Sequence, residues 1–204
     1  AQSGAVVLDA TEVVNNGNGT YTLNAARWNS QGGAPLCVDE PFRGQFTVGF
    51  CSGFLVGQDI AVTAGHCVSS PGDAFVFGFD QLGAGTGPGA DPNLIVPAEN
   101  VYFVTQVINQ ALAGGLDHSV VRLDRPVVGR TPLPVRRTGG PAVGEPLVMI
   151  GHPTVLPKKI DAGGQVRQAD GTGAGGINYF TANVDAYGGN SGSMVINATP
   201  GVIE

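Results

Sequence analysis

The sequence predicts an all-β protein, folded as a sandwich or as barrels. Short apolar runs bounded by Gly, Pro, Asn and Asp recur about every 10 to 20 residues, whereas helical patterns of about 11 or more residues are scarce. The 204 residues include 33 Gly and 14 Pro, which supply the turns that an all-β chain needs. Apolar residues make up 42% and charged residues 13%, a composition that can bury a core and excludes a disordered linker.

Seven expected strands lie in the first part of the chain. Each is a run rich in apolar, β-branched or aromatic residues that meets a turn-forming Gly, Asn, Asp or Pro nearby. In chain order they are AVVL (5–8), TYTL (20–23), TVGFCSGFLV (47–56), IAVT (60–63), AFVFGF (74–79), VYFVTQVI (101–108) and SVVRL (119–123).

Four further expected strands follow a stretch rich in Gly and Pro at residues 130–144. We place the boundary between two β halves in this stretch, because such residues mark loops between ordered segments. The strands of the second half are PLVMI (146–150), GQVR (164–167), YFTANV (179–184) and MVI (194–196).

Charge and hydropathy exclude several kinds of partner. The net charge is −6 and the 10 Lys and Arg residues are scattered, whereas affinity for nucleic acid depends on clustered basic charge. No stretch approaches the roughly 20 continuous apolar residues of a membrane span. We therefore expect neither nucleic acid nor a membrane as a partner.

The first motif that carries chemistry is a Gly-rich turn, GGNSGS, at residues 188–193. Its glycines allow a tight backbone that presents the hydroxyl of Ser191 ahead of the last expected strand. Turns of Gly and Ser are also common as plain hairpin loops, so this motif alone leaves both interpretations open.

A second motif, TAGHC at residues 63–67, ends the expected strand at 60–63. The turn of small residues places the imidazole of His66 at the exit of the strand. Histidine is the side chain best suited to act as a general base near neutral pH. His66 is therefore the candidate base.

A third motif, LDHSVVRL at residues 116–123, places Asp117 at the entrance of an apolar strand. A carboxylate there can accept the Nδ1 proton of an imidazole, although Asp117 taken alone is typical of a turn at a strand start. Together the motifs run in the order His66, Asp117, Ser191, with separations of 51 and 74 residues. They supply a base, an orienting carboxylate and a nucleophile.

With these three motifs in this order, the sequence resembles the trypsin-like serine endopeptidases of chymotrypsin fold. The resemblance runs from about residue 47 to residue 196 and implies two antiparallel β-barrels. Asn190 in place of an Asp before the serine, and the segments IGHP (150–153) and LPKK (156–159), are similar to the bacterial secreted glutamyl-endopeptidase-like branch.

The resemblance also implies a role for each site residue. Ser191 attacks a peptide carbonyl, His66 takes and returns a proton, and Asp117 holds the imidazolium. The backbone N–H groups of Gly189 and Ser191 form the oxyanion hole. No metal and no organic cofactor is expected. Of the remaining histidines, we expect His118 and His152 to be structural.

The three cysteines leave one without a partner in this chain. The resemblance implies a disulfide between Cys51 and Cys67 beside His66, whereas the alternative is two reduced cysteines in the core. Cys37 is then free or paired with a cysteine outside this chain. A disulfide implies an oxidising compartment, so we expect a secreted or periplasmic protein.

Three segments are expected along the chain. Residues 1–46 form a lead-in that packs on the barrels, residues 47–135 form the first barrel with His66 and Asp117, and residues 136–204 form a second barrel with Ser191 that lacks its last strands. We therefore expect a further C-terminal segment of the same precursor beyond Glu204.

The predicted function is a secreted serine endopeptidase acting on protein or peptide substrates through an acyl-enzyme. Asp185, six residues before Ser191, matches the position at the base of the primary pocket in relatives that prefer Arg or Lys, which implies cleavage after Arg or Lys, with Glu as the second choice. The alternative for Asp185 is a cap on the turn after a strand. The alternative function is a catalytically silent extracellular binding module of the same fold.

Overall fold

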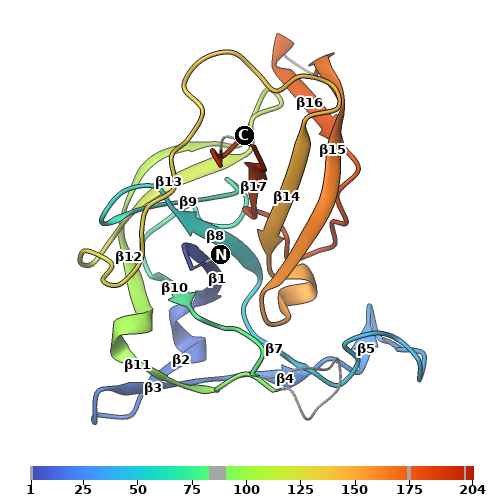
Figure 1. Cartoon of the computed structure of the whole chain (residues 1–204). Coiled ribbons are helices and arrows are strands. Elements are labelled where there is room, and N and C mark those ends of the chain that lie inside the picture. The colour runs from blue at the N-terminus through green and yellow to red at the C-terminus, as the bar shows by residue number, and fades with distance from the viewer. Residues whose placement is uncertain (1, 83–90, 174–175, 200) are drawn as a thin grey trace.

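Six antiparallel strands close into a barrel in the first half of the chain (Figure 1). The structure is a computed structural model and describes residues 2–82, 91–173, 176–199 and 201–204. Around the barrel the strand order is β1, β10, β12, β13, β9, β8. The bounds are β1 Gly4–Asp9, β8 Cys51–Leu55, β9 Ile60–Thr63, β10 Asp73–Phe77, β12 Val101–Ala111 and β13 His118–Leu123.

The N-terminal lead-in does more than pack on the barrel, because its strand β1 is one of the six. Val7 of β1 lies opposite Cys51 on one side and Phe75 on the other. Side chains alternate along a strand, and β1 is buried on both faces. Ala5 and Val7 belong to the barrel core, whereas Val6 and Leu8 belong to a second apolar cluster outside it.

A small sheet packs on this second cluster and contributes Val13, Leu23 and Val96 to it. It has three strands, β2 (Val13–Asn15), β3 (Thr20–Leu23) and β11 (Ile95–Pro97), in the order β11, β3, β2. Two shorter ladders complete the lead-in: β4 (Ala26–Arg27) pairs with β7 (Phe46–Thr47), and β5 (Ser30–Gln31) pairs with β6 (Ala34–Pro35).

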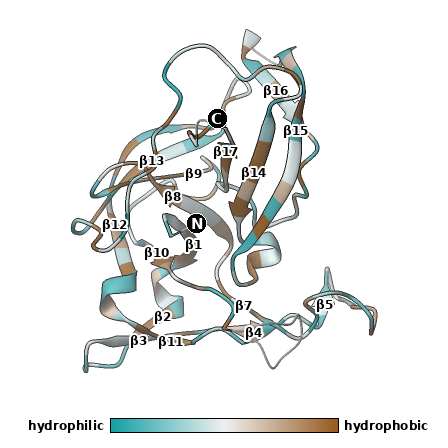
Figure 2. Cartoon of the chain, viewed as in Figure 1, coloured by the Kyte–Doolittle hydropathy of each residue, from teal (hydrophilic) through white to brown (hydrophobic). Residues whose placement is uncertain are grey.

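The second half forms an antiparallel sheet in the order β16, β15, β14, β17. The bounds are β14 Pro146–Gly151, β15 Lys159–Thr172, β16 Asn178–Ala182 and β17 Met194–Asn197. Figure 2 shows β14 as largely hydrophobic, in keeping with its buried side chains. A third apolar cluster, which includes Phe54 of β8, Ile150 of β14 and Met194 of β17, joins the two halves.

The predicted all-β class and two-part architecture are confirmed by a closed barrel and a separate sheet. Strands β3 and β9 cover the same residues as predicted. The predicted strand at 47–56 is divided, because Gly49 adopts a positive φ of 81° and packs against the backbone of Val7. Among the described residues, no helix is long and apolar enough to cross a membrane.

Candidate active site

The turn after β9 brings His66 to the edge of the first barrel. Gly65 allows this, because a Cβ atom there would lie 2.4 Å from the carbonyl oxygen of Ala111 and 2.9 Å from the backbone N of His118. Only a residue without a side chain lets the turn pack so closely on the end of β12 and the start of β13. That contact sets His66 beside Asp117, the residue before β13.

Two hydrogen bonds join His66 to Asp117. The Nδ1 atom of His66 lies 2.7 Å from Oδ2 of Asp117, and the backbone N–H of His66 donates to Oδ1 over 2.9 Å. A carboxylate only accepts, so Nδ1 carries the proton and Nε2 of a neutral ring is left as an acceptor. Burial raises the pKa of Asp117, but the hydrogen bonds from His66 outweigh burial and hold that pKa below its usual value.

The loop that carries Ser191 packs on the same part of the barrel. Ser52 of β8 donates its backbone N–H to the carbonyl oxygen of Ser191 over 2.8 Å. Gly192 has a φ of 81°, and a Cβ there would lie 2.2 Å from the Ser52 carbonyl oxygen and 2.9 Å from the backbone N of Ala64. The loop thus contacts the turn that carries His66. Within the described chain no hydrogen bond joins the Ser191 hydroxyl to His66, and such bonds are often long before substrate binds.

The backbone around Gly189 is fixed by the residues that follow β14. Gly188 accepts a hydrogen bond from the backbone N–H of Thr154. Gly189 has a φ of 88°, and a Cβ there would lie 2.8 Å from the carbonyl oxygen of His152. Among the described residues, the N–H groups of Gly189 and Ser191 donate to no protein acceptor. Two free donors beside a serine are what an oxyanion hole requires.

Comparison with known proteins bears on the family of the chain and on its fold. A sequence profile described as a trypsin-like peptidase domain matches residues 51–203, which is most of the chain. The chain belongs to the trypsin-like peptidase family. The expected family is therefore confirmed, whereas the glutamyl-endopeptidase-like branch stays a prediction. A search of curated proteins found no match.

Solved structures show the trypsin-like peptidase fold as well. The serine endoprotease from Yersinia pestis is similar with a TM-score of 0.55 and 14% identity, over 100% of this chain and 52% of that protein. An inactive mutant form of Rv3671c from M. tuberculosis H37Rv is similar with a TM-score of 0.50 and 18% identity, over 75% of this chain and 67% of that one. This peptidase domain spans about half the length of the Yersinia protein.

The predicted disulfide of the peptidase domain is confirmed between Cys51 and Cys67. It closes β8 onto the turn beside His66, and one ring nitrogen of His66 lies within 4.8 Å of both cysteine sulfurs. Both sulfurs are part of the disulfide, and the form of cysteine that binds metal ions is the free thiolate. This cluster therefore cannot bind a metal ion through its cysteines. Cys37 is exposed and free within the chain.

The peptidase domain also depends on Ser52, which the sequence analysis did not single out. Its buried hydroxyl donates to the carbonyl oxygen of Gly189 over 2.8 Å and accepts from the backbone N–H of His152 over 2.9 Å. One side chain therefore joins β8, the end of β14 and the Ser191 loop. No sequence signal distinguishes Ser52 from another small residue in the apolar run CSGFL.

His152 occupies the structural position expected of it. Its Nδ1 lies 2.9 Å from the carbonyl oxygen of Leu156, and its ring stacks on Phe79. Burial lowers the pKa of His152 to about 3, so the ring is neutral in ordinary buffers. His118, the other spare histidine, lies with Nε2 2.8 Å from Oδ1 of Asn109, on the strand pair behind the site.

Asp185 is exposed in the peptidase domain, whereas the specificity prediction assumed a buried carboxylate. It follows β16 on the loop toward Ser191, and its backbone N–H donates to Oδ2 of Asp161 over 2.8 Å. Among the described residues, none buries the Asp185 side chain. Its role in specificity stays a prediction.

Proposed function

We propose that this chain is a serine endopeptidase domain that hydrolyses peptide bonds in polypeptides. The observation that carries the proposal is the hydrogen-bonded pair of His66 and Asp117. The loop that carries Ser191 packs on the same barrel, and it presents two N–H groups without a protein acceptor among the described residues. A binding module has no need of an imidazole held by a carboxylate in one tautomer.

The mechanism follows from these groups. The Ser191 hydroxyl attacks the peptide carbonyl carbon while Nε2 of His66 accepts its proton. The N–H groups of Gly189 and Ser191 stabilise the oxyanion that forms. His66 then gives the proton to the leaving amine, and the acyl-enzyme remains. A water molecule, deprotonated by His66, hydrolyses that ester and restores the Ser191 hydroxyl.

A fluorophosphonate probe distinguishes an enzyme from a silent module of the same fold. The phosphorus reagent reacts with a serine hydroxyl only where a base and oxyanion donors activate it. We expect the intact protein to be labelled at Ser191, as read by peptide mapping, and His66→Ala to lose the labelling. A folded protein that leaves the probe unreacted would support the binding module.

The choice of substrate residue is a second part of the proposal. Asp185 and Asp161 lie together beside the loop that leads to Ser191, and both are acidic. Carboxylates there favour a cationic side chain before the scissile bond, so we propose cleavage after Arg or Lys.

Chromogenic peptides with Arg, Lys or Glu before the scissile bond test this choice. We expect the Arg and Lys peptides to be cleaved faster than the Glu peptide. Asp185→Asn should reduce this ratio of cleavage rates about tenfold, because a charge-assisted hydrogen bond contributes a free energy of this order. Asp170→Asn, an acidic residue further along β15, is the matched control. A clear preference for Glu would favour the glutamyl branch instead.

The cell compartment and partners follow from the same features. The Cys51 to Cys67 disulfide is typical of an oxidising environment, which favours a location outside the cytoplasm. The partners are then protein or peptide substrates in that compartment. A further C-terminal segment that adds strands to the open sheet β16, β15, β14, β17 stays a prediction.

A further inference from the structure

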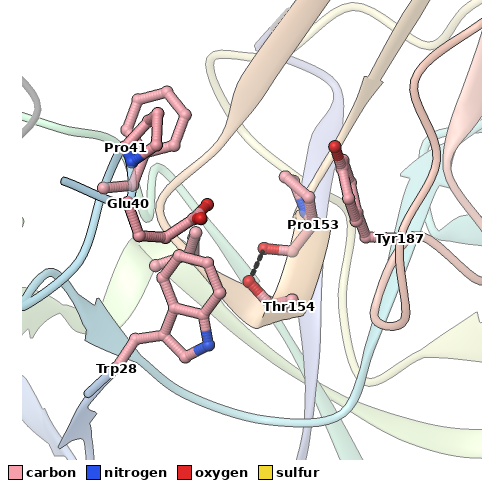
Figure 3. Close-up of a pocket in the computed structure, with 8 residues that line it drawn as sticks. Trp28, Glu40, Pro41, Pro153, Thr154 and Tyr187 are labelled. Atoms are coloured by element: carbon pink, nitrogen blue, oxygen red, sulfur yellow. Dashed lines mark hydrogen bonds between the residues drawn. The ribbon is translucent and has the colours of Figure 1, made fainter. Parts of the chain in front are cut away.

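A pocket of about 160 Å³ lies between the lead-in and the second half of the chain (Figure 3). One part of its lining comes from residues before position 51, outside the stretch that matches the peptidase family. The other part comes from the segment after β14 and from the loop before Ser191. The lining includes Trp28, Glu40, Phe42, Pro153, Thr154 and Tyr187.

The pocket combines aromatic rings with one carboxylate. Figure 3 shows the ring of Trp28 and the carboxylate of Glu40 together on one side, with Pro153 and Tyr187 across from them. The indole N–H of Trp28 already donates to Gln31, so the ring face is its remaining binding surface. Among the described residues, the carboxylate of Glu40 forms no ion pair.

Phe42, the third ring, already has a cation on it. The ammonium group of Lys159 lies 4.5 Å from its ring centre and donates to Oε1 of Gln45. Phe42 thus already makes a cation–π contact, while the rings of Trp28 and Tyr187 make no such contact in the described structure.

The pocket adjoins the candidate catalytic loop. Thr154 lines both this pocket and a neighbouring hollow of about 270 Å³, whose lining includes Gly188 and Gly189. The carbonyl oxygen of Tyr187 accepts from the backbone N–H of Asn190, next to Ser191. A polypeptide bound at Ser191 can therefore reach the pocket with a neighbouring side chain.

We propose that this pocket binds the side chain of an arginine in the polypeptide substrate, at a position other than the one before the scissile bond. A guanidinium stacks on aromatic faces and pairs with a carboxylate in the same plane, which fits Trp28, Tyr187 and Glu40 together. The net charge of −6 also favours a cationic ligand. The role as a substrate subsite rests on the proposed function, whereas binding of arginine to the pocket does not.

The fluorescence of Trp28 gives a direct test, because the chain contains a single Trp. The protein is the full chain with Ser191→Ala, and the probes are peptides that differ at one position as Arg, Lys, norleucine or Glu. We expect a saturable change with Arg, a weaker response with Lys, and none with norleucine or Glu. Added salt should weaken the Arg response, because Glu40 is exposed.

Two substitutions locate the binding energy. Glu40→Gln should weaken Arg binding about two- to fivefold, the order expected for one exposed ion pair, because the rings that stack on the guanidinium remain. Asp39→Asn removes the same charge from the neighbouring exposed residue and should leave binding unchanged. Equal responses to Arg and norleucine, or equal effects of the two substitutions, would overturn the proposal.

The same peptides separate this proposal from the proposed function. With the intact Ser191, the arginine position that gives the Trp28 response should also raise kcat/KM, and Glu40→Gln should remove that gain. A Trp28 response without any hydrolysis would refute the peptidase and leave the arginine pocket standing. The pocket alone would be refuted if peptides were hydrolysed, kcat/KM did not change with arginine at any position other than the one before the scissile bond, and the Trp28 fluorescence did not change.

Discussion

Replacing Ser191 by alanine should lower kcat for peptide hydrolysis by about 10⁵ to 10⁶, because the step that forms the acyl-enzyme loses its nucleophile. Stability should change little, since the described contacts of Ser191 are made by its backbone: its carbonyl oxygen accepts from Ser52, and its N–H is free. Active-site titration and thermal unfolding, measured on the same preparation, check both expectations.

Ser193 provides the matched control. It lies on the same loop two residues later, but its hydroxyl donates to Oδ1 of Asn190 over 3.1 Å and is already engaged. Ser193→Ala should therefore keep kcat within about tenfold of the original, the cost of one lost hydrogen bond. If Ser191→Ala retained most of the activity, or if both variants lost it equally, Ser191 could not be the nucleophile.

The fold was predictable to the extent that its signals are local. Strands β3 and β9 are short apolar runs flanked by turn residues, and the sequence predicts their exact residues. Strands β4, β5 and β6 have two residues each, which is too short for any alternating pattern to appear. The entry of β1 into the barrel depends on its pairing with β8 and β10, more than 40 residues away, and local patterns carry no such information.

The candidate site was predictable for a different reason. His66, Asp117 and Ser191 each stand in a motif whose residue types serve chemistry and tight turns. Ser52 stands in no motif, and its role appears only when the Ser191 loop folds back onto β8. The arginine pocket likewise joins residues near positions 28, 42 and 154, which no spacing rule connects.

Burial was the least predictable property. The prediction for Asp185 assumed a buried carboxylate because of its spacing to Ser191. Spacing gives the position of a residue along the chain, but it does not determine whether other strands bury its side chain. In the structure Asp185 is exposed, and its backbone N–H donates to the carboxylate of Asp161. Exposure depends on segments distant in sequence, which is why the same spacing can accompany a buried or an exposed side chain.

Asp117→Asn should lower kcat by about 10⁴ while the protein stays folded. An asparagine can still accept the backbone N–H of His66 through its oxygen, but its amide group donates to Nδ1 and forces the ring proton onto Nε2. The ring then offers no acceptor to the Ser191 hydroxyl. Single-turnover hydrolysis of an activated ester measures the loss at the acylation step.

Asp59→Asn is the matched control for charge. Asp59 forms an exposed ion pair with Arg122 on the same barrel, over 2.7 Å, and lies away from the site. Its replacement should change kcat by less than about twofold, in keeping with the small energies of surface ion pairs. If the two substitutions lowered kcat equally, the effect of Asp117 would be one of general charge and not of orienting His66.

The pH dependence supplies a further check on Asp117. Its pKa in the folded chain lies below the usual 3.8, because the hydrogen bonds from His66 outweigh the effect of burial. A carboxylate whose pKa is lowered on folding stabilises the folded state above its unfolded pKa, and this contribution is lost as the pH falls through the folded pKa. Asp117 is therefore ionised throughout the range from pH 5 to pH 8. Asp117→Asn should therefore lower the rate of hydrolysis at every pH in that range. If the variant regained the original rate as the pH fell toward 5, Asp117 would titrate in that range, and the claim that it is ionised there would be wrong.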